Sequence, residues 1–526
     1  MKPRILQVLG ILAVTGIFVY VAGVTPEEVS DLLHNAQTVW RGARESLNSA
    51  CSLQEMTEQE QEVQRIVSEI RVMRARLQRL NGQERTPSID GLNIELRQLA
   101  ENMGGTLEEC RRRIEAVADQ RNPVQENTGG RPRYIIDPTS IQESFNAGIP
   151  FNVEARLQGV SASTMYRRRR DLGLLQQNRY TDIPDNDLDA TMGRILARDP
   201  NCGRSMAVGA LRREGVIVQR RRISASLQRV GGLRIEARFP IPIRRQPYRA
   251  VCPGWIWHID SYHKLNGHPR RISRHAVRWG ISIQGGVDGY SRTCTFLSAA
   301  GYNTADLMKR AFLLGVREYG FPSRIRTDRG SENVEIGRFM VNLRGHQHNA
   351  HFKGSSVHNV PIERFWGEVG QHCTREFKKL FEDFEEEGIL DTLSDVDIFA
   401  LHFVYLPIIN TALEEFRLDY NLHPIRTRSY MSPNQMRLTG YQRYRHSEYT
   451  SVYEYYNGPP IDVETLIENE SDEHYLIRIC RFGVLEVQQE CIEALFREVL
   501  PFEPENGNGR DKYLLAKVII LHYQDI

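Results

Sequence analysis

The chain has 526 residues, of which 40% are hydrophobic and 25% charged, and this globular composition excludes a wholly disordered or fibrous protein. Its eight cysteines contain no C-x-x-C pair, which argues against a zinc ribbon or a dense disulfide framework. The 68 Lys and Arg residues nearly balance the 66 Asp and Glu residues, but residues 131–250 hold 22 Arg, no Lys and 11 acidic residues, and this local charge of +11 indicates a polyanionic partner.

The N-terminal residues predict a membrane anchor over residues 1–25. Lys2 and Arg4 precede an uncharged, mostly apolar run over residues 5–24, which is long enough to span a bilayer as a helix. No clear small-residue cleavage site follows the run, so an uncleaved anchor is favoured over a secretory signal. A buried helix and a wrongly assigned start of the protein remain as alternatives, which together weigh as much as the anchor.

Residues 50–120 have the pattern of a helical stalk. Apolar residues recur at alternating spacings of three and four over residues 63–80, which is a heptad seam. After a break at residues 81–91, a second helical pattern begins at Leu92. The two segments are predicted either to fold back as a hairpin or to pair with another copy, and a homo-oligomer through this coiled coil is expected. Residues 121–133 follow as a linker.

Residues 134–235 carry two basic helical patterns. In the first, a helix ends at Gly159 and a Ser-capped helix follows, which is the layout of a helix-turn-helix. Residues 187–230 repeat the pattern, so the region is interpreted as a paired helix-turn-helix that binds DNA, with a solvated basic bundle as the alternative. The arginines expected to contact DNA phosphates form two runs: Arg167, Arg168, Arg169, Arg170, Arg220, Arg221 and Arg222.

The hydrophobic period changes after residue 250, where short apolar runs replace the helical pattern. Strands are predicted over residues 255–259, 277–283, 294–297 and 323–327, and helices over residues 304–319 and from about Asn359 onward. Three strands, a helix, a strand and further helices predict an α/β domain with one mixed sheet over residues 250–440.

Three carboxylates of this domain form the candidate catalytic site. Asp260 closes the first predicted strand and Asp328 the fourth, so the two can face each other at the ends of neighbouring strands. Glu363 follows 35 residues after Asp328, in the first turn of a helix that begins near Pro361. Asn359 shares the face of Glu363, and the helix dipole favours the ionised carboxylate.

The composition of this set predicts its cofactor. Carboxylates without a cysteine or histidine cluster favour the hard cations Mg²⁺ or Mn²⁺. Two such ions about 4 Å apart can activate an attacking hydroxyl and stabilise the leaving oxygen of a phosphodiester. Glu332 is the alternative third carboxylate, but it lies too near Asp328 in the sequence to be preferred.

The segment over residues 255–436 resembles the catalytic core of retroviral-type integrases and DDE transposases, which have an RNase H-like fold. The matching pieces are Trp257-His-Ile-Asp260, Val287-Asp-Gly-Tyr-Ser-Arg292, Thr327-Asp-Arg-Gly330, Ile362-Glu-Arg-Phe365, and Tyr420-Asn-Leu-His-Pro424 with Ser432-Pro433. The resemblance implies that Asp260, Asp328 and Glu363 are catalytic metal ligands. It also implies a DNA-binding polynucleotidyl transferase that cuts a strand and joins its 3′-hydroxyl to a target.

The chain departs from that family in several ways. No His-His-Cys-Cys zinc module precedes the core, and Arg329 stands where the family usually has the Asn of an Asn-Gly pair. The apolar N-terminus is foreign to the family, so a transposon-derived, domesticated protein would explain the mixture. The alternatives are an inactive nucleic-acid-binding protein and a membrane-tethered scaffold. DNA activity predicts a nuclear protein, whereas a real anchor predicts a membrane protein.

Other polar residues receive simpler interpretations. Asp288 is predicted to be a turn residue rather than a metal ligand. Residues 441–526 predict a small α/β tail domain that ends in a strand-like run over residues 513–521. An H-x-H-x-x-H cluster is expected to contact solvent or DNA rather than zinc, and its members are His346, His348 and His351.

Overall fold

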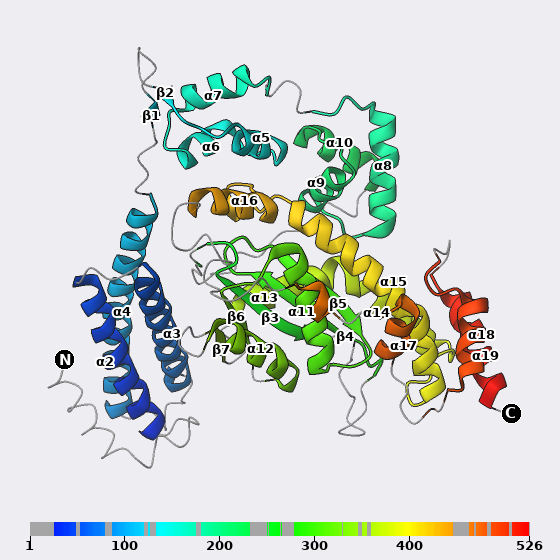
Figure 1. Cartoon of the computed structure of the whole chain (residues 1–526). Coiled ribbons are helices and arrows are strands. Elements are labelled where there is room, and N and C mark those ends of the chain that lie inside the picture. The colour runs from blue at the N-terminus through cyan, green and yellow to red at the C-terminus, as the bar shows by residue number, and fades with distance from the viewer. Residues whose placement is uncertain are drawn as a thin grey trace. The chain divides into compact units, whose positions relative to one another are not determined.

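The chain divides into two compact units, Met1–Asn122 and Pro123–Ile526, with the boundary inside the predicted linker. The predicted anchor over residues 5–24 lies outside the described residues. The computed structural model (Figure 1) describes residues 26–48, 53–78, 87–119, 125–126, 133–174, 180–231, 250, 252–263, 265, 278–328, 330–345, 350–354, 359–444, 462–467, 470–480, 485, 487–503 and 508–524.

The described part of the first unit consists of three helices, α2 (Pro26–Asn48), α3 (Leu53–Gln78) and α4 (Pro87–Asp119). Helix α3 packs against both α2 and α4. The heptad positions Val63 and Ile66 are fully buried in the cluster that the three helices share. Of the two predicted arrangements, the chain therefore has the fold-back one, in which the seam faces helices of the same chain. Contact with a second copy through this seam stays a prediction.

The second unit contains the predicted mixed sheet, whose strand order is β5-β4-β3-β6-β7. Strand β3 pairs antiparallel with β4 and parallel with β6. A separate pair of two-residue strands, β1 (Gln125–Glu126) and β2 (Arg133–Tyr134), precedes it. The bounds of the five strands are β3 (Ile256–Tyr262), β4 (Ser282–Asp288), β5 (Cys294–Ala300), β6 (Arg324–Thr327) and β7 (His351–Lys353).

Successive side chains of a strand point to opposite faces of the sheet, and here apolar side chains on the two faces belong to two different hydrophobic clusters. Helices therefore cover the sheet. Trp257 and Ile259 of β3 pack with α11, whereas Tyr262 packs with α13. The second predicted strand is shifted, since β4 begins at Ser282 rather than at residue 277. The helices of this region are α11 (Ala305–Tyr319), α12 (Val334–Arg344), α13 (Val360–Val369), α14 (Arg375–Glu386) and α15 (Asp395–Leu422), and a π-helical turn, η8 (Gly370–Thr374), joins α13 to α14.

Helix α15 is the central core helix of the second unit. It packs against β5, α9 and α19, and its residues Phe399 and Leu401 are fully buried. Among the described residues, α15 alone is long and apolar enough to cross a membrane, but 72% of its most apolar window is buried in the fold. Its apolar composition is therefore explained by packing.

Two groups of three helices cover one end of this core (Figure 1). The first group contacts α16 (Pro433–Tyr444), and the second packs α9 against α15. A Cβ atom on Gly209 of α9 would lie 2.2 Å from the backbone oxygen of Asp419, so only glycine allows this close approach. The groups are α5 (Pro138–Asn146), α6 (Phe151–Leu157) and α7 (Ala162–Asp171), and α8 (Asp185–Arg198), α9 (Arg204–Arg213) and α10 (Arg220–Gly231).

The C-terminal region differs from its prediction. Its elements are α17 (Asp472–Ile479), α18 (Gln489–Val499) and α19 (Arg510–Gln524), so the strand expected over residues 513–521 is wrong. Tyr513, Ala516 and Ile520 lie on one helical face and are buried. These helices pack on α15, directly or through one another, instead of forming an α/β tail domain.

Candidate active site

The register of the sheet sets Asp260 beside Asp328. Strand β3 runs parallel to β6, and His258 is level with Arg326. Because both strands advance equally, two more residues bring Asp260 level with Asp328, which directly follows the last residue of β6. The expectation that Asp260 closes its strand is wrong, since β3 continues to Tyr262.

Hydrogen bonds from two side chains attach α13 to β3. The Asn359 Nδ2 donates to the backbone oxygen of Ile259 (3.0 Å), and its Oδ1 lies 2.6 Å from Nδ1 of His258. The indole of Trp366 donates to Oδ2 of Asp260 (2.9 Å). Glu363 lies between these two attachment points on the helix, so its position along β3 is fixed by residues on both sides.

Sequence reasoning missed both attachments. Trp366 and Ile362 are buried on the core face of α13, and Glu363 is exposed. Asn359 was expected on the face of Glu363 but is 1% exposed, because its amide bonds with β3. Burial lowers the pKa of His258 well below its usual value, so its ring is neutral and donates from Nδ1 to Asn359.

The three carboxylates act on one another electrostatically. Burial raises the pKa of Asp260 to about 6, against the hydrogen bond from Trp366, and the negative charges of Glu363 and Asp328 raise it further. Such coupling requires the three groups to lie near each other. No set of three His, Cys, Asp or Glu side chains within the described part of the chain is, however, already gathered around one metal position.

Asp328 is oriented by the turn that follows it. Its Oδ1 accepts hydrogen bonds from the backbone N–H of Gly330 (3.0 Å) and from Nδ2 of Asn333 (2.7 Å). Asn333 ends a short 3₁₀ helix, Ser331–Asn333, and is fully buried. The unusual Arg329 lies outside the described residues.

Two other sequence interpretations can be compared with the structure. Asp288 was predicted to be a turn residue but is the buried last residue of β4. Its carboxylate accepts hydrogen bonds from the backbone of Gly254 and from Ser291 in the turn that follows. His351 does not extend into solvent as expected: its Nε2 lies 2.8 Å from Oγ1 of Thr327, and its ring lies where a Cβ of Gly337 would be. His346 and His348 lie outside the described residues.

The first arginine run of the candidate nucleic-acid interface points in several directions. Arg169 is buried and forms an ion pair with Glu154 of α6 (2.6 Å), so the expected phosphate contact of this residue is wrong. Arg168 donates to the backbone oxygen of Tyr134 (3.1 Å). Arg167 and Arg170 are exposed. A helix turns about 100° per residue, so four consecutive arginines cannot share one face.

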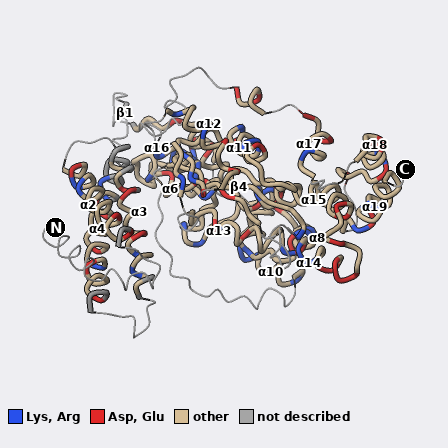
Figure 2. Tube along the Cα trace, turned by 90° about the horizontal axis from the view of Figure 1, so that it is seen from below, with Lys and Arg blue, Asp and Glu red and all other residues tan. Residues whose placement is uncertain are grey.

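The arginines of the second run also lie in different environments. Arg222 pairs with Asp185, and Arg220 stacks over the ring of Tyr430 (4.3 Å from the ring centroid). Arg221 is exposed. The expected phosphate contact of Arg222 is therefore replaced by an ion pair. Figure 2 shows basic positions close to acidic ones in the region of α8 and α14, which agrees with such pairing.

Comparison with known proteins assigns the region that holds the three carboxylates. Residues 247–451 match the family model described as Integrase core domain, about two fifths of the chain. A search of the curated proteins finds no match. The matched range contains the five-stranded mixed sheet and α11 to α16. The segment over residues 247–451 is therefore similar to integrase core domains, and its mixed sheet with flanking helices agrees with the predicted RNase H-like α/β fold.

Proposed function

We propose that this chain is a DNA-binding polynucleotidyl transferase whose catalytic carboxylates are Asp260, Asp328 and Glu363. The integrase core family supports a nucleic-acid substrate. The observation that supports the proposal is the attachment of α13 to β3 by Trp366 and Asn359, because Glu363 lies between these two residues on the helix. Asp260 lies on β3, and Asp328 directly follows β6, the adjacent parallel strand. Strand β3, the turn after β6 and helix α13, which are far apart in the sequence, would each contribute one carboxylate.

The donor set fits Mg²⁺ or Mn²⁺. Burial, and to a smaller extent the charges of Glu363 and Asp328, raise the pKa of Asp260, so a divalent cation would offset both the burial and the repulsion of its charge. Mg²⁺ takes one or two carboxylates together with substrate phosphate oxygens, so a cage of three carboxylates around one ion is not required. When bound, two such ions would activate the attacking oxygen and stabilise the leaving oxygen.

The contribution of the protein itself is to orient the carboxylates before substrate arrives. Trp366 holds one oxygen of Asp260, and Asn333 with the backbone of Gly330 holds one oxygen of Asp328. These donors lie on or next to helices and on the turn after a buried strand, which keeps the orientation rigid. DNA cleavage and joining by a freed 3′-hydroxyl are the reactions that this set supports best.

The helix pairs α6–α7 and α9–α10 are proposed as the helix-turn-helix elements that bind DNA. Their support is the +11 charge of residues 131–250 and the exposure of Arg167, Arg170 and Arg221. Action on DNA implies a nuclear protein, whereas an anchor over residues 5–24 implies a membrane one. A fluorescent fusion of residues 1–30 beside one of the full chain distinguishes the two.

The second candidate is a nucleic-acid-binding protein that has lost the reaction. It is favoured by one observation, that no three acidic or other metal-binding side chains in the described ranges already surround one metal position. Both candidates bind DNA, so only a catalytic measurement separates them.

The test is a strand-cleavage and strand-transfer assay with Mn²⁺ on the full-length chain and its Glu363→Gln variant. Glu335→Gln is the matched control, because Glu335 also lies in the first turn of a helix, α12. We expect activity in the wild type and in Glu335→Gln, loss of activity in Glu363→Gln, and unchanged DNA affinity in all three. An inactive wild type that binds DNA would support the second candidate.

A further inference from the structure

A pocket lies where the second three-helix group meets the segment after α15. It has a volume of about 210 Å³, and its floor is apolar, with Val208, Ile223 and Pro424 among its lining residues. Its polar lining consists of Arg212, Gln219, Arg220, Tyr180 and Tyr430. None of the described lining residues is acidic. The pocket thus combines an apolar floor, aromatic walls and positive charge.

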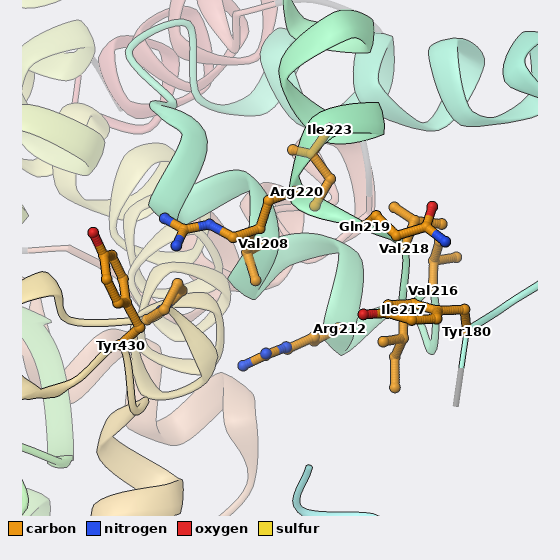
Figure 3. A pocket seen from close by; sticks show the side chains of 11 residues that line it. Tyr180, Val208, Arg212, Val216, Ile217, Val218, Gln219, Arg220, Ile223 and Tyr430 are labelled. Atoms are coloured by element: carbon orange, nitrogen blue, oxygen red, sulfur yellow. The ribbon is translucent and has the colours of Figure 1, made fainter. Parts of the chain in front are cut away.

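Tyr430 and Arg220 form one wall. The guanidinium of Arg220 lies 4.3 Å from the centroid of the Tyr430 ring, and this tyrosine is 47% exposed. Figure 3 shows Arg220 and Arg212 extending toward Tyr430 from the side of α9 and α10, with Tyr180 at the other end of the pocket. The wall therefore consists of a guanidinium stacked on one face of an aromatic ring, and this pair presents its outer faces to a flat ligand.

The loop that presents Tyr430 is held in an unfavourable conformation. Ser429 and Tyr430 both have positive φ values, 55° and 58°, which cost energy in residues other than glycine. Backbone hydrogen bonds of Ile425 with Tyr430 and Met431 close the loop at 3.1 and 3.0 Å. Such a conformation persists only where the surrounding structure enforces it, and here it keeps a large aromatic ring at the surface.

Three further arginines are sequence neighbours of lining residues. Arg426 and Arg428 lie on the same loop as Tyr430, and Arg221 follows Arg220 on α10; all three are exposed. Guanidinium groups pair well with phosphate oxygens. A ligand that places a flat ring in the pocket and phosphates outside it would meet a complementary group at each point.

We propose that this pocket takes an unpaired base of DNA, stacked on Tyr430 and Arg220, with the adjoining phosphates on Arg221, Arg426 and Arg428. The inference rests on the proposed function, because it names which form of DNA the chain recognises. Stacking on aromatic and guanidinium planes is how proteins hold unstacked bases. The pocket is smaller than the roughly 300–1,000 Å³ of sites for drug-sized ligands, which suits one flat ring system.

A paired base cannot reach this pocket, because it is stacked inside the duplex. The proposal therefore predicts a preference for duplexes that carry a single-stranded tail. Stacking one base contributes a factor of roughly five to one hundred in affinity, so the full-length chain should bind a tailed duplex about tenfold more tightly than a blunt duplex of equal length.

The experiment measures binding of both duplexes to the full-length chain, with 2-aminopurine placed in the tail. Tyr430→Gly removes the ring and also relieves the positive φ, so folding is not threatened. We expect this variant to lose the preference for the tail and the quenching of 2-aminopurine, while it binds the blunt duplex as before. Tyr430→Phe should keep both properties, because its ring still stacks.

Tyr475→Ala is the matched control, because Arg310 stacks on Tyr475 in the same manner outside the pocket. This variant should keep the preference. Equal affinity for tailed and blunt duplexes in the wild type would overturn the base proposal, leave the proposed function intact and point to a protein side chain as occupant. Failure to bind either duplex would overturn the proposed function and the pocket proposal together.

Discussion

The two three-helix groups of the second unit look alike in sequence but attach to the core by different interactions. The first, α5 to α7, meets α16 through neutral hydrogen bonds, such as that from the Gln442 amide to Oγ of Ser144 (2.9 Å). The second, α8 to α10, meets α15 through ion pairs of Arg198 and Arg213 with Asp419 (2.6 and 2.8 Å) and through the close approach at Gly209.

This difference indicates a division of roles. A neutral hydrogen bond contributes only about 0.5–1.5 kcal/mol net to stability, so the first group is joined to the core by contacts of small net free energy. The second group is joined by close packing and by charges that are mostly buried, so α10 and its arginines have a fixed position relative to the loop of Tyr430. We infer that the second group belongs structurally to the core, although its sequence resembles the first.

The largest expected effect tests the internal structure of the first group. Arg169→Met removes one partner of the buried pair with Glu154 and leaves a carboxylate with 0% exposure uncompensated. We expect a loss of about 3–5 kcal/mol in the free energy of unfolding. Chemical denaturation measures it, and Arg167→Met, at an exposed position of the same helix, should change stability little. Equal effects of the two substitutions would contradict the assignment.

The attachment of the second group is tested at Gly209. Gly209→Val places side-chain atoms against the backbone oxygen of Asp419, so α9 must move away from α15. We expect a loss of about 3 kcal/mol in unfolding free energy. Gly193→Ala in α8 is the control: its Cβ would meet nothing closer than 3.9 Å, and it should stabilise the protein by about 0.5–1 kcal/mol. A neutral Gly209→Val would contradict the close approach.

The second group also contacts the core through an ion pair that depends on pH, between Asp199 after α8 and His372 of the π-helical turn. Burial opposes its charge, but hydrogen bonds to Asp199 and Glu368 prevail and raise the pKa of His372 to about 9. His423 lies near His372, and burial lowers the pKa of His423. Because the folded pKa of His372 exceeds the unfolded value of about 6.5, its stabilisation is complete below pH 6.5 and disappears as the pH rises through 9.

We therefore expect the free energy of unfolding to fall by about 1–3 kcal/mol between about pH 6.5 and 9. His372→Gln should flatten this part of the curve, as measured by denaturation over a pH series. His474→Gln, at an exposed position of α17, should leave the slope as in the wild type. A slope that survives in His372→Gln would assign the pH dependence to another group.

The smallest expected effect concerns the binding of DNA by α7 of the first group. Neutralising Arg167 and Arg170 should weaken binding to all sequences and flatten the dependence of log K on log salt by about 0.9 for each DNA phosphate that an arginine no longer neutralises. Arg168 and Arg169 have partners inside the protein, so Arg168→Gln should change the slope much less. Salt titrations of DNA affinity provide the measurement, and equal slopes for all variants would remove α7 from the interface.

Much of the fold could be predicted from local patterns, and the errors have physical causes. The change of period after residue 250 identified the strands, but the pairing of β3 with β6 is non-local and needed the resemblance. The β-branched residues Val518, Ile519 and Ile520 favour a strand by propensity, yet helical spacing decides their burial. The partners of Asn359 and Trp366 lie about one hundred residues away, so no local signal reveals them.

The error at Arg169 could have been avoided. Met165 and Arg169 are four residues apart and share the buried face of α7. Helical spacing from Met165 would therefore have assigned Arg169 to the interior. The candidate triad stays a prediction from order and spacing. Asn333 and Trp366 orient two of its carboxylates, and their roles appear only in three dimensions.

The central claim is that β3, β6 and α13 bring Asp260, Asp328 and Glu363 to one metal-binding site. Anomalous diffraction from Mn²⁺-bound crystals of the full-length chain with DNA tests it most directly. We predict anomalous peaks between Asp260 and Asp328, with Glu363 as a further ligand. Manganese bound away from these residues, or held by Glu332 while Glu363 makes no contact, would contradict the claim.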